Sequence, residues 1–178
     1  MSVLRLELVA APAGPPNVTH SGGNPGAGAT QREISGRVLV ATSAMPWNVV
    51  GRPSGYPGPV RFAPRSVDLA SIGPSPVLRD HDPARPIGRH VAAVNGRGGL
   101  GLSMRLAAGV QDADEALALV AEGVQLGVSL GVDATAYDVD RKTGLLTVLA
   151  ALHRETSVLT FPAYAAARAT LPEEGTAT

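Results

Sequence analysis

Two stretches of the sequence alternate apolar residues with small or polar ones, and this pattern constrains the fold more than any other feature. The stretches run from Leu100 to Leu106 and from Val128 to Thr135. Successive side chains of a β-strand point to opposite faces, so each stretch predicts a half-buried strand. Further strands are expected where Val, Ile and Leu are abundant: over residues 3–9, 33–42 and 145–160, the last as one long strand or as two separated by a bend.

A single helix is clearly indicated between the two alternating stretches. Asp112 is a suitable N-cap, Glu115 can complete a capping box, and Gly123 is a typical helix stop. Two further short helices are expected, over residues 66–70 and 162–170. Many strands and few helices predict a β-rich α+β domain, built as a small barrel or a curled, mostly antiparallel sheet with a few flanking helices.

Glycine and proline divide the chain into regions. Residues 1–30 are expected to form an amino-terminal strand followed by a flexible Gly/Pro-rich linker, residues 31–170 a folded domain, and residues 171–178 a mobile tail. Six prolines make residues 45–75 irregular, and the glycines of Asn95–Gly99 predict a hairpin turn. A chain of 178 residues suits one globular domain.

The composition excludes several classes of function. Lys+Arg and Asp+Glu both number 15, and this balance argues against nucleic acid or an anionic membrane as partner. The absence of cysteine excludes disulfides, a thiolate nucleophile and cysteine-ligated metals. No apolar run reaches the roughly 20 residues of a membrane span, and Arg5 and Glu7 interrupt the apolar amino terminus. We expect a soluble, intracellular protein without a cofactor.

A nucleophile in this chain must come from Ser, Thr or a carboxylate, and histidine is the most plausible base. His81 lies in the segment Leu78–Gly88, where two prolines and a glycine restrict the backbone just after it. Asp80 and Asp82 flank it, and their negative potential favours an imidazolium. The alternative is a solvated histidine in a surface turn.

Ser129 is the candidate nucleophile, at the centre of the motif Gly127-Val128-Ser129-Leu130-Gly131. The nucleophile elbow of esterases has a similar pattern but requires a strand, a sharp turn and a helix, whereas an extended pattern continues here. A serine flanked by glycines on a strand can still be a nucleophile, because the missing side chains leave room for a substrate backbone. A tightly packed strand crossing is the alternative.

A third candidate segment is Leu152–Val158. On a strand, His153, Glu155 and Ser157 share one face, and charge within such an apolar strand needs a buried partner or a functional reason. A surface-facing strand edge is the alternative. The histidines at positions 81, 90 and 153 lack the spacing of zinc ligands, so no metal site is predicted.

Taken in order, three motifs resemble the phage prohead (capsid maturation) proteases of the HK97 type, which are related in fold to the herpesvirus assembly protease. They are His81–Gly88, Gly127–Gly131 and Glu155–Ala163. Ile34–Arg37 and Arg61–Pro64 are similar to the opening elements of that family. The resemblance covers roughly residues 33–168, and it is carried by the order and intervals of the motifs rather than by any one of them.

The resemblance implies a serine endopeptidase that cleaves phage scaffold and capsid proteins inside the immature head, in the host cytoplasm. It implies Ser129 as nucleophile, His81 as general base and Glu155 as the third member of the triad. His153 is the alternative third member, because the herpesvirus relatives use a second histidine. Those relatives are activated by dimerisation, so a homodimer is also possible.

Two alternatives to an active protease stay open at this point. The first is a protease-derived structural or decoration protein of the capsid or tail, which the balanced charge and the expected linker fit equally well. The second, weaker alternative is a small esterase that uses the same serine.

Overall fold

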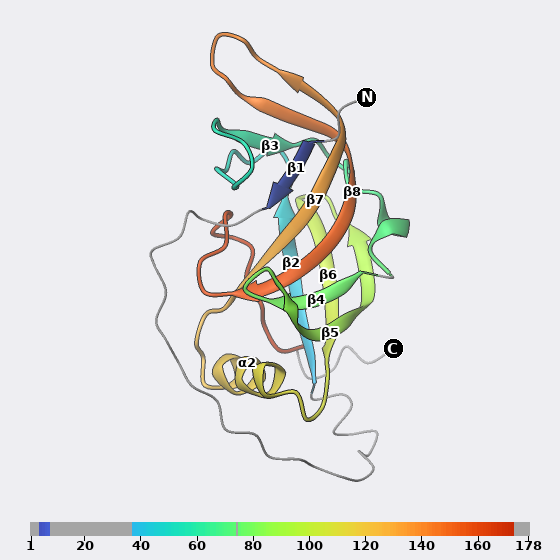
Figure 1. Cartoon of the computed structure of the whole chain (residues 1–178), viewed down its shortest axis with the longest axis vertical. Helices are drawn as coiled ribbons and strands as arrows, with labels where there is room; N and C mark the ends of the chain where they lie inside the picture. The colour runs from blue at the N-terminus through green and yellow to red at the C-terminus, as the bar shows by residue number, and fades with distance from the viewer. Residues whose placement is uncertain (1–3, 8–36, 74, 173–178) are drawn as a thin grey trace.

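The computed structural model describes residues 4–7, 37–73 and 75–172. In chain order the elements are β1 (Leu4–Glu7), β2 (Val38–Pro46), β3 (Val60–Phe62), the 3-10 turn η1 (Leu69–Ser71), β4 (Pro76–Arg79), β5 (Asp82–Asn95), β6 (Gly99–Leu106), α2 (Gln111–Ala121), β7 (Gly127–Val139) and β8 (Leu146–Leu159). The strands form one curled sheet, and α2 packs at its lower end in the view of Figure 1. The predicted β-rich α+β class is confirmed.

The sheet has the strand order β1-β7-β8-β4-β5-β6-β2, with β3 paired to β8 outside this path. Most neighbours are antiparallel, and the exceptions are the parallel pairs that β8 makes with β3 and β4. Strand β8 therefore joins the long β7–β8 hairpin to the β4–β5–β6–β2 part of the sheet. This central place brings segments far apart in the sequence next to β8.

Aliphatic side chains fill the inside of the curled sheet, as the scarcity of aromatic residues requires. The largest fully buried side chains are Phe62, Leu6, Leu39, Met45, Ile72, Ile87, Leu100, Met104, Leu106, Leu126 and Leu130. Strand β7 is buried along its first eight residues, so both of its faces are covered there. The half of β7 that carries Ser129 therefore lies inside the domain, whereas its far end extends into solvent.

The predicted strands are found with shifted ends. The two alternating stretches are β6 and β7, and residues 145–160 form one strand, β8, rather than two. The amino-terminal strand is β1, paired with β7, and the strand expected over residues 33–42 begins at Val38, with residues 33–36 outside the described part of the chain. The hairpin turn is confirmed by the bond from Gly96 N to Gly99 O (2.9 Å).

The helix α2 is confirmed, but the prediction of its cap is wrong. The N-cap position is Val110, which makes no side-chain cap bond. Asp112 instead binds Arg85 of β5 through both carboxylate oxygens, at 2.8 and 2.9 Å. A paired contact with a guanidinium is stronger than a neutral cap bond, so the carboxylate fastens α2 to the sheet.

Neither of the two further predicted helices forms an α-helix. The first is the single 3-10 turn η1, which Asp68 caps by accepting a bond from Ala70 N (3.0 Å). The second, residues 162–170, consists of bends and turns whose backbone bonds to strands instead. Val128 N donates to Ala167 O and Val40 N donates to Thr170 O, each at 2.8 Å. The expected linker and the last six residues fall outside the described residues.

Candidate active site

His81 lies in a two-residue turn between β4 and β5. Arg79 pairs with Asp82, and the two residues between them, Asp80 and His81, have φ values of 54° and 58°. A left-handed backbone at both central positions is the arrangement of a type I′ turn, which favours Asn and Gly. This conformation typically costs another L-residue roughly 1–2 kcal/mol. Such local strain is characteristic of functional sites.

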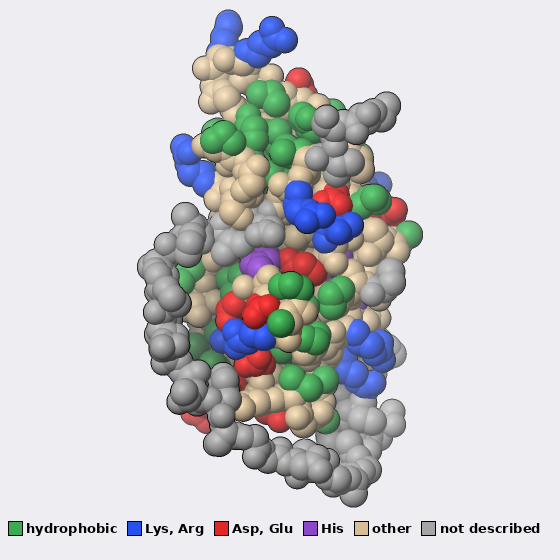
Figure 2. Space-filling model, viewed as in Figure 1, with side chains coloured by type: hydrophobic (Ala, Val, Ile, Leu, Met, Phe, Trp, Pro, Cys, Tyr) green, Lys and Arg blue, Asp and Glu red, His purple; other side chains and the backbone are tan. Residues whose placement is uncertain are grey.

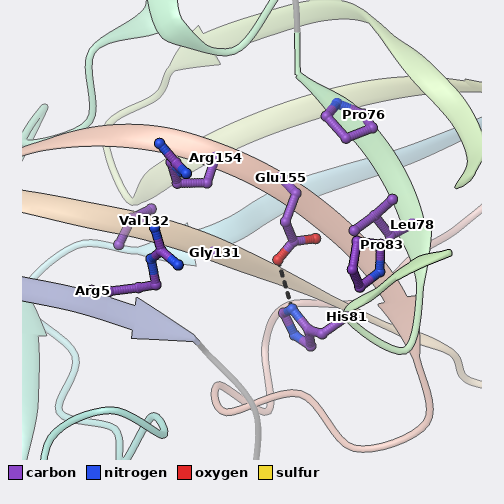
Figure 3. A pocket seen from close by; sticks show the side chains of 9 residues that line it. All are labelled: Arg5, Pro76, Leu78, His81, Pro83, Gly131, Val132, Arg154 and Glu155. Carbon is purple, nitrogen blue, oxygen red and sulfur yellow. Dashed lines mark hydrogen bonds and ion pairs between the residues drawn. The ribbon is translucent and has the colours of Figure 1, made fainter. Parts of the chain in front are cut away.

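A carboxylate holds the imidazole of His81. Its Nδ1 lies 2.6 Å from Glu155 Oε1, and the two side chains are only 8% and 14% exposed. Glu155 reaches it from β8, as Figure 3 shows. Ser157 donates to Glu155 Oε2 (2.8 Å) and accepts from the backbone N–H of His81 (2.9 Å). The serine thus ties the left-handed turn and the carboxylate to each other.

Gly131 of β7 leaves the space that the carboxylate occupies. It lies directly opposite Glu155 in the antiparallel pair, and a Cβ atom at this position would stand 2.6 Å from Glu155 Oε1. The carboxylate could not move aside without leaving His81 and Ser157. The second glycine of the Gly-x-Ser-x-Gly motif therefore leaves room for the carboxylate of Glu155 on the neighbouring strand.

The second ring nitrogen of His81, Nε2, is the one that can react, because no described protein group binds it. Nε2 is buried and has no hydrogen-bond partner among the described residues. With the Nδ1 proton donated to the carboxylate, the lone pair of a neutral imidazole resides on Nε2. The pair is arranged so that this nitrogen can accept a proton.

Ser129 projects from the same face of the sheet. It is buried, lies directly opposite Ser157 in the register of β7 and β8, and is two residues from Gly131. Side chains of directly opposite residues in an antiparallel pair share a face. Ser129, Glu155 and Ser157 are therefore gathered on one side of the β7–β8 pair, the side to which the His81 turn is fastened.

The prediction that His153 shares this face is wrong. The register shifts between Gly131 and Val132, so that β8 has an extra residue, Arg154, at a bulge. His153 is turned to the opposite face, where its ring bonds Thr156 Oγ1 (2.9 Å) and Ser75 Oγ (2.6 Å). Burial lowers the pKa of His153 to about 3. The geometry joins His81 to Glu155 and not to the alternative third member.

A pocket of about 270 Å³ opens beside the His81–Glu155 pair. Its wall includes the side chains of Arg5 from β1 and Arg154 from the bulge, drawn in Figure 3. Both guanidinium groups pair with Asp133, at 3.4 and 3.2 Å. In Figure 2 a histidine is visible in the middle of this face, next to acidic side chains and below a group of basic ones.

Sequence reasoning missed several contributors to this site. Arg5 and Arg154 were not predicted to line the site: Arg5 belongs to no motif, and the bulge that turns Arg154 towards the pocket is not visible in the pattern of Leu152–Val158. The role of Ser157 could have been found, since it lies two positions after Glu155 and strand periodicity places the two side chains on the same face. Within the described ranges, no group of three or more His, Asp or Glu side chains is arranged to hold a metal ion.

The chain matches a known protein family. Residues 61–177, about two thirds of the chain, match the model of a protein family described as caudovirus prohead serine protease. The matched range contains His81, Ser129 and Glu155. No curated protein matches the chain.

Proposed function

Because this chain belongs to the caudovirus prohead serine protease family, we propose that it is an HK97-type endopeptidase that cleaves scaffold and capsid proteins inside the immature phage head. The observation that carries the proposal is the buried His81–Glu155 contact of 2.6 Å, on the face of the sheet that also bears Ser129. The pocket beside this contact offers space for part of a substrate chain.

In the proposed mechanism Ser129 is the nucleophile and His81 the general base. His81 Nε2 takes the hydroxyl proton as Ser129 Oγ attacks the scissile carbonyl, and it then gives this proton to the leaving amine. The bond to the amine breaks, and an ester to Ser129 is left. Water, deprotonated by the same nitrogen, hydrolyses the ester and restores the serine.

Glu155 is proposed as the third member of the triad. Its carboxylate accepts the Nδ1 proton of His81, which fixes the tautomer with a free Nε2 and stabilises the imidazolium formed during attack. Ser157 occupies the other carboxylate oxygen and so restricts rotation of the group. The bonds of His153 to Ser75 and Thr156 on the other face support Glu155 rather than His153 in this role.

The test is Ser129→Ala, compared with Ser103→Ala on β6 as the control. We expect Ser129→Ala to fold normally and to lose cleavage of the phage's precursor capsid protein by a factor of roughly 10⁴ or more, with Ser103→Ala unchanged. Undiminished processing by Ser129→Ala would refute the proposal.

A fluorophosphonate probe identifies the nucleophile directly. The serine oxygen forms a bond to phosphorus and fluoride leaves, so the modified residue can be located by mass spectrometry of the digested protein. We expect the label on Ser129. A label on Ser157 instead would show that the wrong serine has been assigned.

A further inference from the structure

A second group of polar side chains is buried behind the His81–Glu155 pair, on the opposite face of β8. Ser75, His90, His153 and Thr156 are each at most 9% exposed. Thr156 Oγ1 lies 2.9 Å from Nε2 of both histidines, whose rings meet edge to face with centroids 5.1 Å apart. His153 Nδ1 contacts Ser75 Oγ at 2.6 Å, and His90 Nδ1 contacts the carbonyl of Ser75 at 3.1 Å.

These contacts fix the direction of the hydrogen bonds. Ser75 Oγ donates its only proton to Ile72 O (2.6 Å), so it accepts from His153 Nδ1. The carbonyl oxygen of Ser75 can only accept, so His90 Nδ1 donates to it. Each neutral ring then presents the lone pair of its Nε2 to Thr156 Oγ1, whose hydroxyl has one proton to donate and is shared by the two rings. Thr156 therefore joins the two imidazoles, and both lose a partner if its hydroxyl is removed.

The cluster connects the strands that bear the catalytic pair. Ser75 immediately precedes β4, His90 belongs to β5, and Thr156 belongs to β8. The turn between β4 and β5 carries His81, and Glu155 is the residue before Thr156. Because alternate side chains of a strand point to opposite faces, a rotation of β8 that displaces the hydroxyl of Thr156 also displaces the carboxylate of Glu155.

We propose that Thr156, with His90 and His153, positions Glu155 against His81, an inference that rests on the proposed function. Aliphatic side chains would hold these strands together equally well, but they would set neither the rotation of β8 nor its distance from β5. Directional bonds set both. Catalytic groups need this control, since a displacement of 1 Å at the reacting atoms can cost roughly 100-fold in rate.

The test is Thr156→Val, which keeps the shape of the side chain and removes the hydroxyl. We expect the maximal rate constant of inactivation by a fluorophosphonate to fall about 10-fold or more, with the concentration for half-maximal rate unchanged, because binding does not involve this face. Thr156→Ser restores the hydroxyl and is expected to return the rate constant to within about 3-fold of the original. Thr135→Val, an exposed threonine of β7, is the matched control and should change nothing.

Two outcomes overturn the inference: an unchanged rate constant in Thr156→Val, or a fall that Thr156→Ser fails to reverse. Should Thr156→Val not fold, His90→Gln and His90→Asn provide the same comparison. The glutamine amide reaches the place of Nε2 and can bond Thr156, whereas the asparagine amide cannot. We expect a rate constant several-fold higher for His90→Gln, and equal values would overturn the inference.

A measurement on the cluster itself separates this inference from the proposed function. Imidazole ¹⁵N spectra of Ser129→Ala, a variant whose spectra need no activity, should show His153 and His90 both protonated at Nδ1. A ring protonated at Nε2 alone would overturn the bonding scheme whatever the chain cleaves. Cleavage by Ser129→Ala would instead contradict the proposed function, and it would have no bearing on the spectra.

Discussion

Histidine side chains lie on both faces of β8, but their surroundings on the two faces are opposite in character. On one face His81 contacts a carboxylate and lies beside a pocket, with one ring nitrogen free of protein partners among the described residues. On the other face His90 and His153 are enclosed by hydroxyl and carbonyl groups, and burial lowers the pKa of both. A histidine becomes a candidate base through a charged partner and a ring nitrogen that no protein group occupies, whereas burial among neutral partners makes it a structural hydrogen-bonding group.

The largest expected effect that distinguishes the faces is that of Glu155→Gln. The amide has nearly the same shape but cannot stabilise an imidazolium or fix the tautomer of His81. We expect kcat for cleavage of the capsid precursor to fall by roughly 10³–10⁴, as for a triad carboxylate. His153→Gln is the comparison on the other face and should reduce kcat far less. Equal losses in the two variants would show that the faces do not differ in this way.

Gly131→Ala should have an intermediate effect. The new methyl group would stand 2.6 Å from Glu155 Oε1 and displace the carboxylate from His81. We expect a loss of about 10–100-fold in kcat/KM with little change in secondary structure. Gly98→Ala is the matched control, since a Cβ at Gly98 meets nothing within 4 Å. Full activity in Gly131→Ala would mean that the carboxylate position does not limit catalysis.

The smallest expected effect concerns stability below neutral pH. The pKa of His153 falls from 6.5 to about 3 on burial, so the unfolded chain binds a proton more readily than the folded one. Its contribution to stability is present above pH 6.5 and is lost progressively as the pH falls towards 3. Tm should therefore decrease over this range, and less steeply in His153→Gln, which cannot take up the proton. Parallel curves would contradict this.

Periodicity carried most of what could be predicted. Alternation placed β6 and β7, the apolar composition of residues 145–160 placed β8, and the period of a strand put Glu155 and Ser157 on one face. It misplaced His153 because the bulge at Arg154 inserts one residue, and a bulge depends on the pairing of two strands rather than on the sequence of one. Strand β5 was not predicted because Pro83 and Pro86 argue against a strand, although the irregular register with β4 accommodates them.

The contacts within the site could not be predicted from periodicity. The bond between His81 and Glu155 spans 74 residues and depends on the parallel pairing of β4 with β8, which no local pattern indicates. Asp112 was expected to cap α2 because capping is a local interaction. A distant partner, Arg85, binds it instead. Family motifs selected the residues, and only the fold shows how His81 and Glu155 meet.

The shortness of the Asp80-His81 turn limits how this protease can vary. Surface loops ordinarily accept insertions and deletions. Here one additional or missing residue between Arg79 and Asp82 would change the type of turn and reverse the side on which the imidazole emerges. Insertions and deletions among homologues should therefore occur in other loops. Mutant libraries built to alter substrate preference should keep the number of residues in this hairpin unchanged.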